Sequence, residues 1–339
     1  MKIGIIGTGR IAGRFVPEAL AARNIEITAV YNPHMGSAER FAGERCKGLQ
    51  VCATTDLEEF MDMVDTVYIA APHETHYGYI MECLAYGKHV LCEKPMVLSR
   101  PQAEECFRTA AENDLILMEG IKTAYCPGYR KLLETAASGI IGDIQYIESC
   151  FTKLEDGGKR ELINTAYGGS FTELGSYVLL PILDLFGRGY ETVRFSGIWG
   201  ANGLDIFMKT DVAYRNCFAS ALCGLGVKAE GRMIVSGTKG YILVRAPWWK
   251  TSHIEVHFED PGRTVTYDLP FEGDGLRYEI REFTDWIKRK DDRTFAASCD
   301  RSIIMAGLME RFLQDRRSRK ENGSWSLTAG YGDKRVRAK

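Results

Sequence analysis

The sequence of 339 residues predicts two domains: an α/β domain on a doubly wound parallel sheet, then an α+β domain with an open, mainly antiparallel sheet. The length exceeds what one hydrophobic core usually spans. In residues 1–122, short apolar runs alternate with segments of helical period, which is typical of parallel strands joined by helices. In residues 123–339, strand-like stretches follow one another without intervening helices, which indicates antiparallel pairing. We therefore expect the first domain to be 1–122 and the second 123–339.

The elements of the first domain follow from its apolar runs and helix-start signals. Thr55 begins a Thr-x-x-Glu capping box, and Ser99 precedes Pro101 in the first turn of another helix. Pro17 should bend the first helix. Strands are predicted at 2–7, 25–31, 66–71, 89–92 and 115–119. Helices are predicted at 10–23, 37–46, from about 55, at 76–86 and from 99 to about 113.

The second domain is predicted from alternation of apolar and polar residues. Helices are expected at 129–138, 170–186, 277–290 and 302–317. Strands are expected at 144–151, 192–199, 205–214, 217–223, 232–235, 241–244, 253–259 and 264–269. In the last two strands, a common face is expected to hold Ile254, Val256, Phe258, Val265, Tyr267 and Leu269.

The composition excludes several classes of protein. With 45% hydrophobic and 26% charged residues, the chain is neither disordered nor collagen-like. No apolar run approaches the roughly 18 residues of a membrane span, and the start MKIGIIGTGR lacks a signal peptide's apolar stretch. The formal net charge of −2 favours neither a nucleic-acid nor a membrane partner. The ten cysteines have no Cys-x-x-Cys spacing, so we expect reduced thiols in a cytoplasmic protein, and no metal site.

The charge is unevenly distributed. From Arg311 to Lys339, nine Lys and Arg stand against three acidic residues, which gives +6 for this tail and −8 for the rest. A basic tail can contact nucleic acid, but this one has little aromatic interleaving and no recognition motif. We interpret it as a solvated helix end followed by a loose terminus.

A glycine-rich turn follows the first predicted strand and precedes the first helix. Its pattern is Gly7-x-Gly9-x-x-Ala12. Gly7 permits the tight turn, Gly9 lets the backbone approach a pyrophosphate, and Ala12 keeps the helix close to the strand. The helix N-terminus adds N–H groups and the positive end of the helix dipole. This context predicts dinucleotide binding rather than a merely structural turn.

The residue at the end of the second predicted strand usually contacts the adenosine ribose and indicates whether its 2′ position carries a hydroxyl or a phosphate. Asn32 occupies this place and can bond a hydroxyl without repelling a phosphate. His34, Ser37 and Arg40 are close enough in sequence to help bind a 2′-phosphate. Alternatively, Asn32 and Pro33 simply form a turn. The sequence leaves NAD and NADP open.

An acid, a base and a proline follow the strand predicted at 89–92. Glu93, Lys94 and Pro95 lie where open α/β sheets bind ligands. An X-Pro bond can be cis, which would turn the Lys94 side chain into the cleft. A partly buried lysine there can hold a substrate hydroxyl and shift the pKa of a neighbour. A surface Glu–Lys pair in a turn explains the segment equally well.

These motifs, in this order and spacing, resemble the glucose–fructose oxidoreductase / inositol dehydrogenase / rhizopine-catabolism (Gfo/Idh/MocA) family. The combination that includes Glu93-Lys94-Pro95 is the most specific part, and the resemblance covers nearly the whole chain. Further matches are Ala71-Pro72-His73-x-x-His76, Gly87-Lys88-His89-Val90, Met118-Glu119-Gly120, 168–177, 237–240 and Tyr278-Glu279-x-x-x-Phe283.

The resemblance implies a Rossmann domain followed by an open sheet, whose exposed face forms a homodimer or homotetramer. It implies oxidation or reduction of a carbinol or ketone of a sugar, cyclitol or related polyol with NAD or NADP. The implied pyrophosphate contacts are Gly7, Thr8, Gly9, Arg10 and Ile11. The implied cofactor lining is Ala71, Pro72, His73 and His76, with Glu93 and Lys94 at the nicotinamide end.

The helix predicted at 170–186 departs from the family pattern. The family typically has Asp-x-x-x-His, or Asp-x-x-x-Tyr in one subgroup, whereas this chain has Glu173-x-x-x-Tyr177. The spacing places both side chains on one face of a helix. The resemblance is therefore to the subgroup of sugar oxidoreductases and dihydrodiol dehydrogenases. It implies that Tyr177 exchanges the proton, Lys94 orients the oxygen and lowers the tyrosine pKa, and Glu173 positions one or both. Alternatively, Tyr177 packs at the domain interface with its hydroxyl bonded.

Substrate contacts are expected after the strand at 115–119. Many members have an arginine where this chain has Ala124, and Lys122 can supply the positive charge instead. Trp248 and Trp249 either line the substrate cleft or form a packed loop, and we prefer the packed loop. The expected substrate-binding residues are Lys94, Lys122, Tyr125 and Tyr177.

Two other functions fit the resemblance. One is a glycosidase that uses bound NAD transiently, with no net redox change. The other is a non-catalytic dinucleotide sensor that binds partner proteins, which should lack the lysine that is present here as Lys94.

Overall fold

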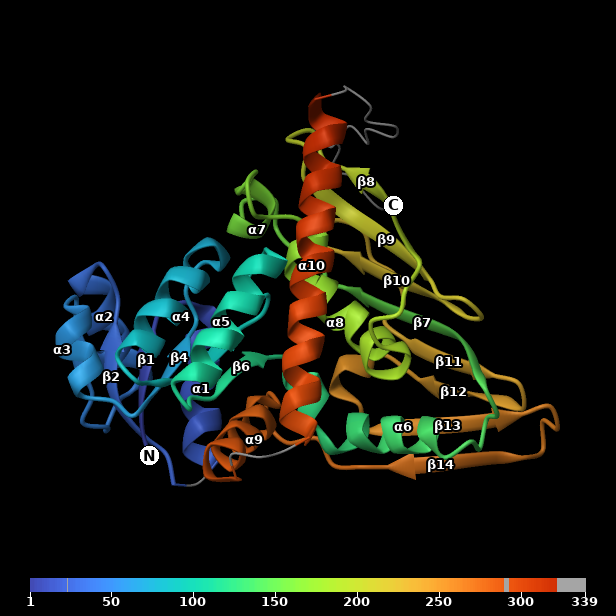
Figure 1. Cartoon of the computed structure of the whole chain (residues 1–339), viewed down its shortest axis with the longest axis horizontal. Coiled ribbons are helices and arrows are strands. Elements are labelled where there is room, and N and C mark those ends of the chain that lie inside the picture. Colours follow the sequence, from blue (N-terminus) through green and yellow to red (C-terminus); the bar gives the residue numbers. More distant parts are fainter. Residues whose placement is uncertain (23, 290–292, 322–339) are drawn as a thin grey trace, which may run out of the picture. The chain divides into compact units, whose positions relative to one another are not determined.

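The structure, a computed structural model, describes residues 1–22, 24–289 and 293–321 (Figure 1). The chain divides into two compact units, and each is described by itself. The first comprises Met1–Ser138, Trp249–Glu255 and Val265–Glu310, and the second comprises Gly139–Trp248, Val256–Thr264 and the chain from Arg311. The predicted loose terminus, residues 322–339, lies outside the described residues.

The first unit is built on a six-stranded sheet of order β3-β2-β1-β4-β5-β6, whose paired strands all run parallel. The order reverses between β1 and β4, and open α/β sheets bind ligands beyond the carboxyl ends of such central strands. The strands are β1 (Lys2–Ile6), β2 (Glu26–Tyr31), β3 (Cys52–Thr54), β4 (Thr66–Ile69), β5 (His89–Glu93) and β6 (Leu117–Gly120).

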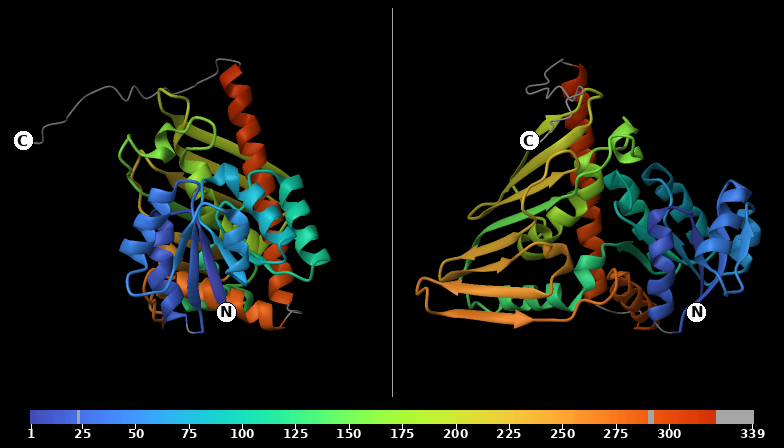
Figure 2. Two further views of the ribbon diagram at one scale, coloured as in Figure 1. Left: turned by 90° about the vertical axis from the view of Figure 1, so that its left-hand side faces the viewer. Right: turned by 180° about the vertical axis from the view of Figure 1, so that it is seen from behind.

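Helices lie on both faces of this sheet, as Figure 2 (left) shows. The predicted doubly wound architecture is therefore confirmed. Fully buried side chains such as Ile3, Ile5 and Phe15 form its core. The helices of the first unit are α1 (Arg10–Ala21), α2 (Met35–Arg45), α3 (Leu57–Asp62), α4 (His76–Ala85), α5 (Arg100–Glu112), α6 (Pro127–Ala137) and α9 (Leu276–Arg289), with 3-10 turns η1 (His73–Thr75) and η2 (Lys122–Tyr125).

Two predicted helix caps differ from the structure. Thr55 does not cap α3, because Asp56 Oδ1 accepts from the N–H groups of Glu58 and Glu59 at 2.9 and 3.1 Å. Ser99 is at the N-cap position of α5, but its hydroxyl donates to Glu310 instead, at 3.2 Å. The carboxylate of Asp56 stands one residue closer to the helix and takes both donors.

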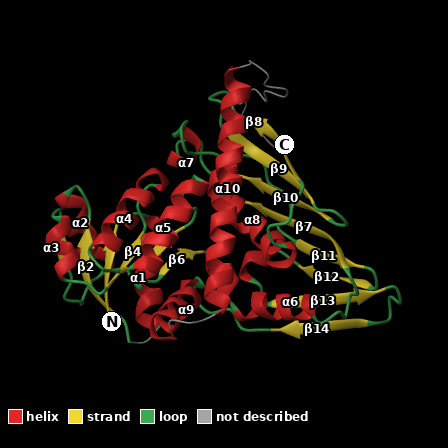
Figure 3. Ribbon diagram, in the orientation of Figure 1, coloured by secondary structure: helices red, strands yellow, loops and turns green. Residues whose placement is uncertain are grey.

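The second sheet has eight strands in the order β14-β13-β12-β11-β7-β10-β9-β8 (Figure 3). β7 and β10 run parallel, whereas β8–β9, β9–β10, β11–β12 and β7–β11 are antiparallel, so the predicted mainly antiparallel sheet is confirmed. The strands are β7 (Ile144–Thr152), β8 (Thr192–Trp199), β9 (Asp205–Ala213), β10 (Phe218–Gly224), β11 (Met233–Gly237), β12 (Gly240–Val244), β13 (His253–Phe258) and β14 (Thr264–Asp268).

The remaining described helices are α7 (Arg160–Ile163), α8 (Ser170–Phe186) and α10 (Arg293–Glu321), with the 3-10 turn η3 (Trp248–Lys250). The part of α10 up to Glu310 belongs to the first unit, and the part from Arg311 belongs to the second. Helix α8 contacts β7, β9 and β10. Helix α10 begins earlier than predicted, because residues 293–301 carry no clear apolar period although they include good helix formers. The predicted solvated helix end is wrong at Arg316, whose side chain is buried and donates to two backbone carbonyls.

Among the described helices, none has the length and apolar character needed to cross a bilayer. All ten cysteines lie in the described part of the chain and are free thiols.

Candidate active site and cofactor site

The glycine loop links β1 to α1, and its two glycines have different surroundings. Gly7 has φ +99, and a Cβ there would lie 2.5 Å from the Ala70 carbonyl oxygen, so only glycine fits. Gly9 is the N-cap of α1 with φ −79, and a Cβ there would meet no described atom within 4 Å. No described side chain caps α1. The turn therefore depends on Gly7, while Gly9 leaves the helix N-terminus open to an anion.

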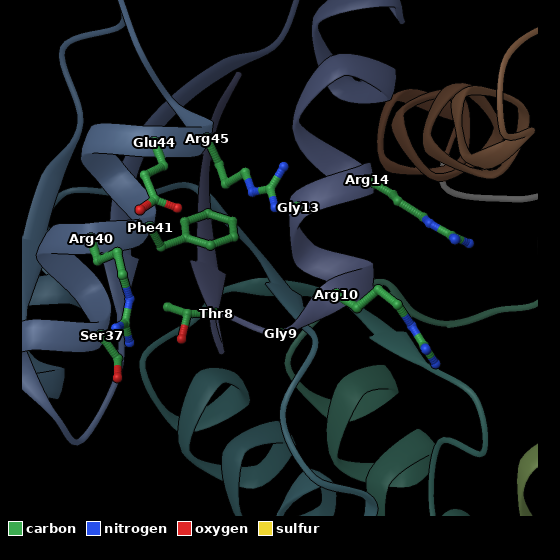
Figure 4. A pocket seen from close by; sticks show the side chains of 10 residues that line it. All are labelled: Thr8, Gly9, Arg10, Gly13, Arg14, Ser37, Arg40, Phe41, Glu44 and Arg45. Carbon is green, nitrogen blue, oxygen red and sulfur yellow. The ribbon is translucent and has the colours of Figure 1, made fainter. Parts of the chain in front are cut away.

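A cavity of about 350 Å³ lies beside this loop, between α1 and α2 (Figure 4). In Figure 4, Arg40 and Ser37 stand together on α2 and Arg45 extends toward Gly13, whereas Arg10 and Arg14 extend from α1 away from α2. Four arginines against one glutamate make this site basic. Its lining is Thr8, Gly9, Arg10, Gly13, Arg14, Ser37, Arg40, Phe41, Glu44 and Arg45.

Asn32 joins the end of β2 to the glycine loop. Its amide donates to the Thr8 hydroxyl at 2.9 Å, and its oxygen accepts from the backbone N–H of His34 at 2.9 Å. The second bond is the turn that the alternative interpretation predicted. His34 is the N-cap of α2 and is exposed. Contact of Asn32 and His34 with the cofactor stays a prediction.

His76 connects the segments that follow β4 and β5. It is fully buried, and its ring nitrogens lie 2.9 Å from the Ala71 carbonyl and 3.0 Å from the Pro95 carbonyl. Burial lowers its pKa, although these hydrogen bonds oppose the shift. His73 packs edge-on against it, with 5.6 Å between ring centroids. His76 therefore shapes the loops, and His73 and Pro72 are the more exposed residues there.

Glu93 and Lys94 stand at the carboxyl end of β5. Glu93 is buried and accepts from the Tyr68 hydroxyl at 2.6 Å, whereas Lys94 is half-buried. Burial raises the pKa of Glu93, and the Lys94 charge and the Tyr68 hydrogen bond oppose the rise. The Lys94–Pro95 peptide is cis, as the sequence allowed. The alternative of an exposed surface pair is wrong, because Glu93 lies in the core of the unit.

Two further buried carboxylates lie at β5 and β6, one on each face of the sheet, and the sequence interpretation gave them no role. Glu119 on β6 accepts from the Met96 N–H at 3.0 Å. Glu279 on α9 is 1% exposed, and a Cβ at Gly120 would lie 3.6 Å from its Oε2. Burial raises the pKa of both, and the Glu93 carboxylate raises that of Glu279 further. The available signal was an acidic residue at an apolar position of a strand or amphipathic helix.

Lys122 and Tyr125, in η2, are held by other residues of the first unit. Lys122 Nζ donates to the Asp274 carbonyl at 2.5 Å, and burial lowers its pKa while Glu279 opposes the shift. Tyr125 is 6% exposed, and its hydroxyl lies 3.2 Å from that of Ser298. Its ring meets Trp286 edge-on at 5.7 Å. These are the contacts of a packed side chain, and substrate binding by either residue stays a prediction.

The packed-loop interpretation of Trp248 is confirmed. Its indole is fully buried and donates to the Cys150 carbonyl at 2.8 Å. Trp249 is half-buried.

Helix α8 carries Glu173 and Tyr177 in the second unit. From Ser170 to Leu183, every residue except these two is buried. The predicted common face is therefore the accessible one. The Tyr177 ring meets Phe151 edge-on, with 5.3 Å between centroids. The structure brings Glu173 and Tyr177 together on α8, and groups Lys94 with the glycine loop in the first unit; joint action across the units stays a prediction.

Within the described ranges, no group of three or more His, Cys, Asp or Glu side chains could hold a metal ion.

Comparison with known proteins agrees with this geometry. Residues 1–121 match the family model described as "Oxidoreductase family, NAD-binding Rossmann fold". The chain is 27% identical over 320 residues to scyllo-inositol 2-dehydrogenase (NADP(+)) IolU of Bacillus subtilis, covering 91% of this chain and 95% of that one. It is 26% identical over 318 residues to human trans-1,2-dihydrobenzene-1,2-diol dehydrogenase, with the same coverage of 91% and 95%.

A solved structure shares the fold. KijD10, a 3-ketoreductase from Actinomadura kijaniata crystallised with NADP and TDP-benzene, superposes with a TM-score of 0.77 at 24% identity, covering 91% of this chain and 96% of that one. With the glycine loop and the Glu93-Lys94-Pro95 segment, these matches identify residues 1–121 as the NAD-binding domain of the Gfo/Idh/MocA oxidoreductase family, and the dehydrogenases named above are similar to the chain over 91% of its length.

Proposed function

We propose that the protein is an NADP-dependent oxidoreductase that acts on a secondary hydroxyl or ketone of a sugar, cyclitol or related polyol. One observation carries the proposal: the half-buried Lys94 stands beside the buried Glu93 at the carboxyl end of β5, in the unit that holds the glycine loop. A cation there can bind a substrate oxygen where open α/β sheets place their ligands. Residues 1–122 supply the cofactor site together with Lys94 and Lys122, and 123–339 supply the other substrate contacts and the second sheet.

The basic cavity supports NADP over NAD. Arg40, Arg45 and Ser37 present positive charge and a hydroxyl between α1 and α2, and a 2′-phosphate is a dianionic group that arginine binds well. Asn32 adds no negative charge where NAD-specific folds place an acid. Glu44 opposes this preference but is outnumbered. The pyrophosphate contacts are Gly7, Thr8, Gly9, Arg10 and Ile11, and the remaining lining is Ala71, Pro72, His73 and Glu93.

Three side chains act on the substrate. When bound, the nicotinamide supplies or accepts the hydride. Lys94 holds the substrate oxygen, and the Tyr177 hydroxyl gives or takes its proton. Glu173, one helical turn before Tyr177, positions the reacting groups. Lys122 contributes positive charge to the substrate site, and Tyr125, whose hydroxyl also contacts Ser298, is a further substrate contact.

We further propose a homodimer or homotetramer that forms through the second sheet. The Ser149 hydroxyl donates to the Val178 carbonyl of α8, so Tyr146 and Glu148, which alternate with it on β7, point to the opposite face. Tyr146 pairs with Phe218, which is 58% exposed, in the same cross-strand row. Figure 2 (right) shows this face without a described helix over it. A single solution mass at the monomer value across concentrations would contradict the proposal.

We place the protein in the cytoplasm, because ten free thiols, most of them buried, fit a reducing compartment. Cell fractionation tests this placement.

A sugar, cyclitol and polyol panel tests the activity, with NAD and NADP in parallel and nicotinamide absorbance as the readout. We expect turnover with NADP, and Lys94→Ala should bind NADP but lose turnover. Lys88→Ala, near the other end of β5, is the matched control and should keep it. Full turnover by Lys94→Ala would contradict the proposed role of Lys94. Sugar release without an absorbance change indicates the NAD-dependent glycosidase, and cofactor binding without any reaction indicates the sensor.

A further inference from the structure

The helix that carries Glu173 and Tyr177 begins at a buried carboxylate from another element. Asp205, the first residue of β9, is fully buried, and its Oδ2 accepts from the backbone N–H of Phe171 at 2.6 Å. The Ser170 hydroxyl donates to the Asp205 carbonyl at 3.0 Å and accepts from Leu225 N–H at 3.0 Å. The N-cap itself is Gly169, which offers no side chain. Asp205 therefore supplies the cap of α8 from a distant part of the sequence.

The residue before α8 has room for no side chain. Gly169 has φ +113, a region that favours glycine, and a Cβ there would overlap Asp205 Oδ1. The aspartate carboxyl therefore packs directly on the backbone of the turn that starts the helix.

Arg316 of α10 holds the same turn from the other side. Its guanidinium donates to the Gly168 carbonyl at 2.7 Å and to the Ala166 carbonyl at 2.5 Å. Nη1 also lies 3.9 Å from Asp205 Oδ1. The side chain is 8% exposed, so these interactions are shielded from solvent. One arginine thus fixes the segment before α8 and faces the carboxylate that caps it.

The groups around Asp205 shift its pKa in opposite directions. Burial raises its pKa to about 7, while the Phe171 N–H and the Arg316 charge oppose the rise. Cys223 of β10 also faces it, and burial raises the pKa of that thiol. Oδ1 has no hydrogen-bond partner among the described residues. Protonation removes the negative charge that strengthens the bond to Phe171 and pairs with Arg316.

We propose that Asp205 and Arg316 are positioning residues that set the first turns of α8, so that the charged form of Asp205 holds Glu173 and Tyr177 in their working orientation. The inference rests on the proposed function, because it concerns the same two side chains. We call Asp205 and Arg316 together the clamp of α8. Neither residue is proposed to contact the substrate. A small displacement of a proton-transferring group lowers the rate of the chemical step without changing cofactor binding.

The pH dependence of kcat tests the proposal. Asp205→Asn keeps the shape and an acceptor oxygen but removes the charge. We expect kcat at pH 8 to fall on the order of 10-fold, and the decline of wild-type kcat below about pH 7 to disappear. The affinity for NADP should stay unchanged. Asp211→Asn, on the same strand with its carboxylate 2.9 Å from Lys209 Nζ, is the matched control and should behave as wild type.

A second measurement tests the ordering of the start of α8 independently of enzyme activity. Hydrogen exchange of the backbone amides of residues 168–174 should accelerate in Asp205→Asn and stay unchanged in Asp211→Asn. Should Asp205→Asn fail to fold, Arg316→Lys replaces it, because lysine keeps the charge but cannot bridge two carbonyls with a planar fork. That variant should show the same faster exchange and a reduced kcat.

The outcomes separate the two claims. Wild-type pH profile and exchange in both clamp variants would overturn the inference while leaving the proposed function intact. A loss of kcat without a change in the pH profile or in exchange overturns it too, because it indicates a merely structural role. No turnover by wild type with any sugar or polyol overturns the proposed function, and exchange then still decides whether the clamp orders α8.

Discussion

The Asn32 amide donates to the Thr8 hydroxyl at 2.9 Å, which ties the end of β2 to the glycine loop after β1. This bond sets a neutral side chain beside the basic cavity that contains Ser37 and Arg40. The character of residue 32 should therefore decide which cofactor the cavity accepts.

Asn32→Asp should reverse the preference for NADP. The carboxylate can still accept from Thr8 and from His34 N–H, so the turn is kept, but its charge repels a 2′-phosphate. We expect kcat/KM with NADP to fall about 10- to 100-fold, as a like-charge contact costs roughly 1–3 kcal/mol, while kcat/KM with NAD holds or rises. Asn32→Ser is the neutral control. Unchanged discrimination in the aspartate variant would contradict a phosphate site here.

Replacement of the two loop glycines by alanine should have different effects: Gly7→Ala should lower stability, and Gly9→Ala should weaken cofactor binding. Gly7→Ala places a Cβ 2.5 Å from the Ala70 carbonyl at φ +99, and should lower the free energy of unfolding by about 1–3 kcal/mol or more. Gly9→Ala has open space and an ordinary φ of −79, so its stability should match wild type. Its Cβ would stand where a pyrophosphate approaches, and NADP should bind at least about 10-fold more weakly.

Thermal unfolding and cofactor titration of both variants check this pair. Gly9→Ala that binds NADP with wild-type affinity would show that the phosphates do not approach the backbone at this loop. Gly7→Ala of wild-type stability would contradict the strained turn.

Local sequence was sufficient to predict the glycine loop and most elements. The loop needs only the strand before it and the helix after it, and α8 was predicted with the bounds that the structure shows. β3 was missed because its three residues, Cys52–Thr54, are too few to show an apolar period. Asp56 took the cap of α3 because two adjacent residues could each have served.

Contacts between distant residues could not be predicted in this way. The residues that face Asp205 come from β10 and α10 as well as the start of α8, and only folding brings these elements together. Arg316 looked like part of a charged tail, because charge counting does not reveal burial. Glu279 was visible as a match to the family pattern, but its closeness to Glu93 depends on the packing of α9 at β5 and β6.

Glu279→Gln should make stability less dependent on pH. Burial and the Glu93 carboxylate raise the pKa of Glu279 well above its usual value, so the folded state binds a proton that the unfolded state has released. The contribution of Glu279 to stability is therefore greatest below its unfolded pKa, near 4.5, and declines as pH rises toward the folded pKa. At pH 8.5, Glu279→Gln should be about 1 kcal/mol or more stable than wild type.

Urea unfolding at pH 5 and pH 8.5 measures this effect. Glu282→Gln on the same helix is the control, because Glu282 pairs with the exposed Arg130 at 2.6 Å and should show no such gain at high pH. Equal pH dependence of Glu279→Gln and wild type would mean that Glu279 titrates normally in the folded protein.

Glu18→Gln should destabilise the first unit by removing its contact with Arg277. Glu18, on α1, is 3% exposed and accepts from Arg277 Nη2 at 2.7 Å and Nε at 3.1 Å, and from the backbone N–H of Arg277 and Asp274. Burial alone raises the Glu18 pKa, but these hydrogen bonds and the Arg277 charge lower it overall. The variant should lose about 2–4 kcal/mol at pH 7, because the arginine keeps its charge without its partner.

The sign of the pH effect is opposite to that of Glu279. A lowered folded pKa contributes stability above the unfolded value, near 4.5, and this contribution disappears as pH falls through the folded pKa. The difference between Glu18→Gln and wild type should therefore shrink in urea unfolding below about pH 4. Glu272→Gln removes the other, half-exposed partner of Arg277, 3.4 Å away, and should cost at most about 1 kcal/mol. Equal losses of stability in Glu18→Gln and Glu272→Gln would show that burial does not make the Glu18–Arg277 ion pair stronger than the exposed Glu272–Arg277 pair.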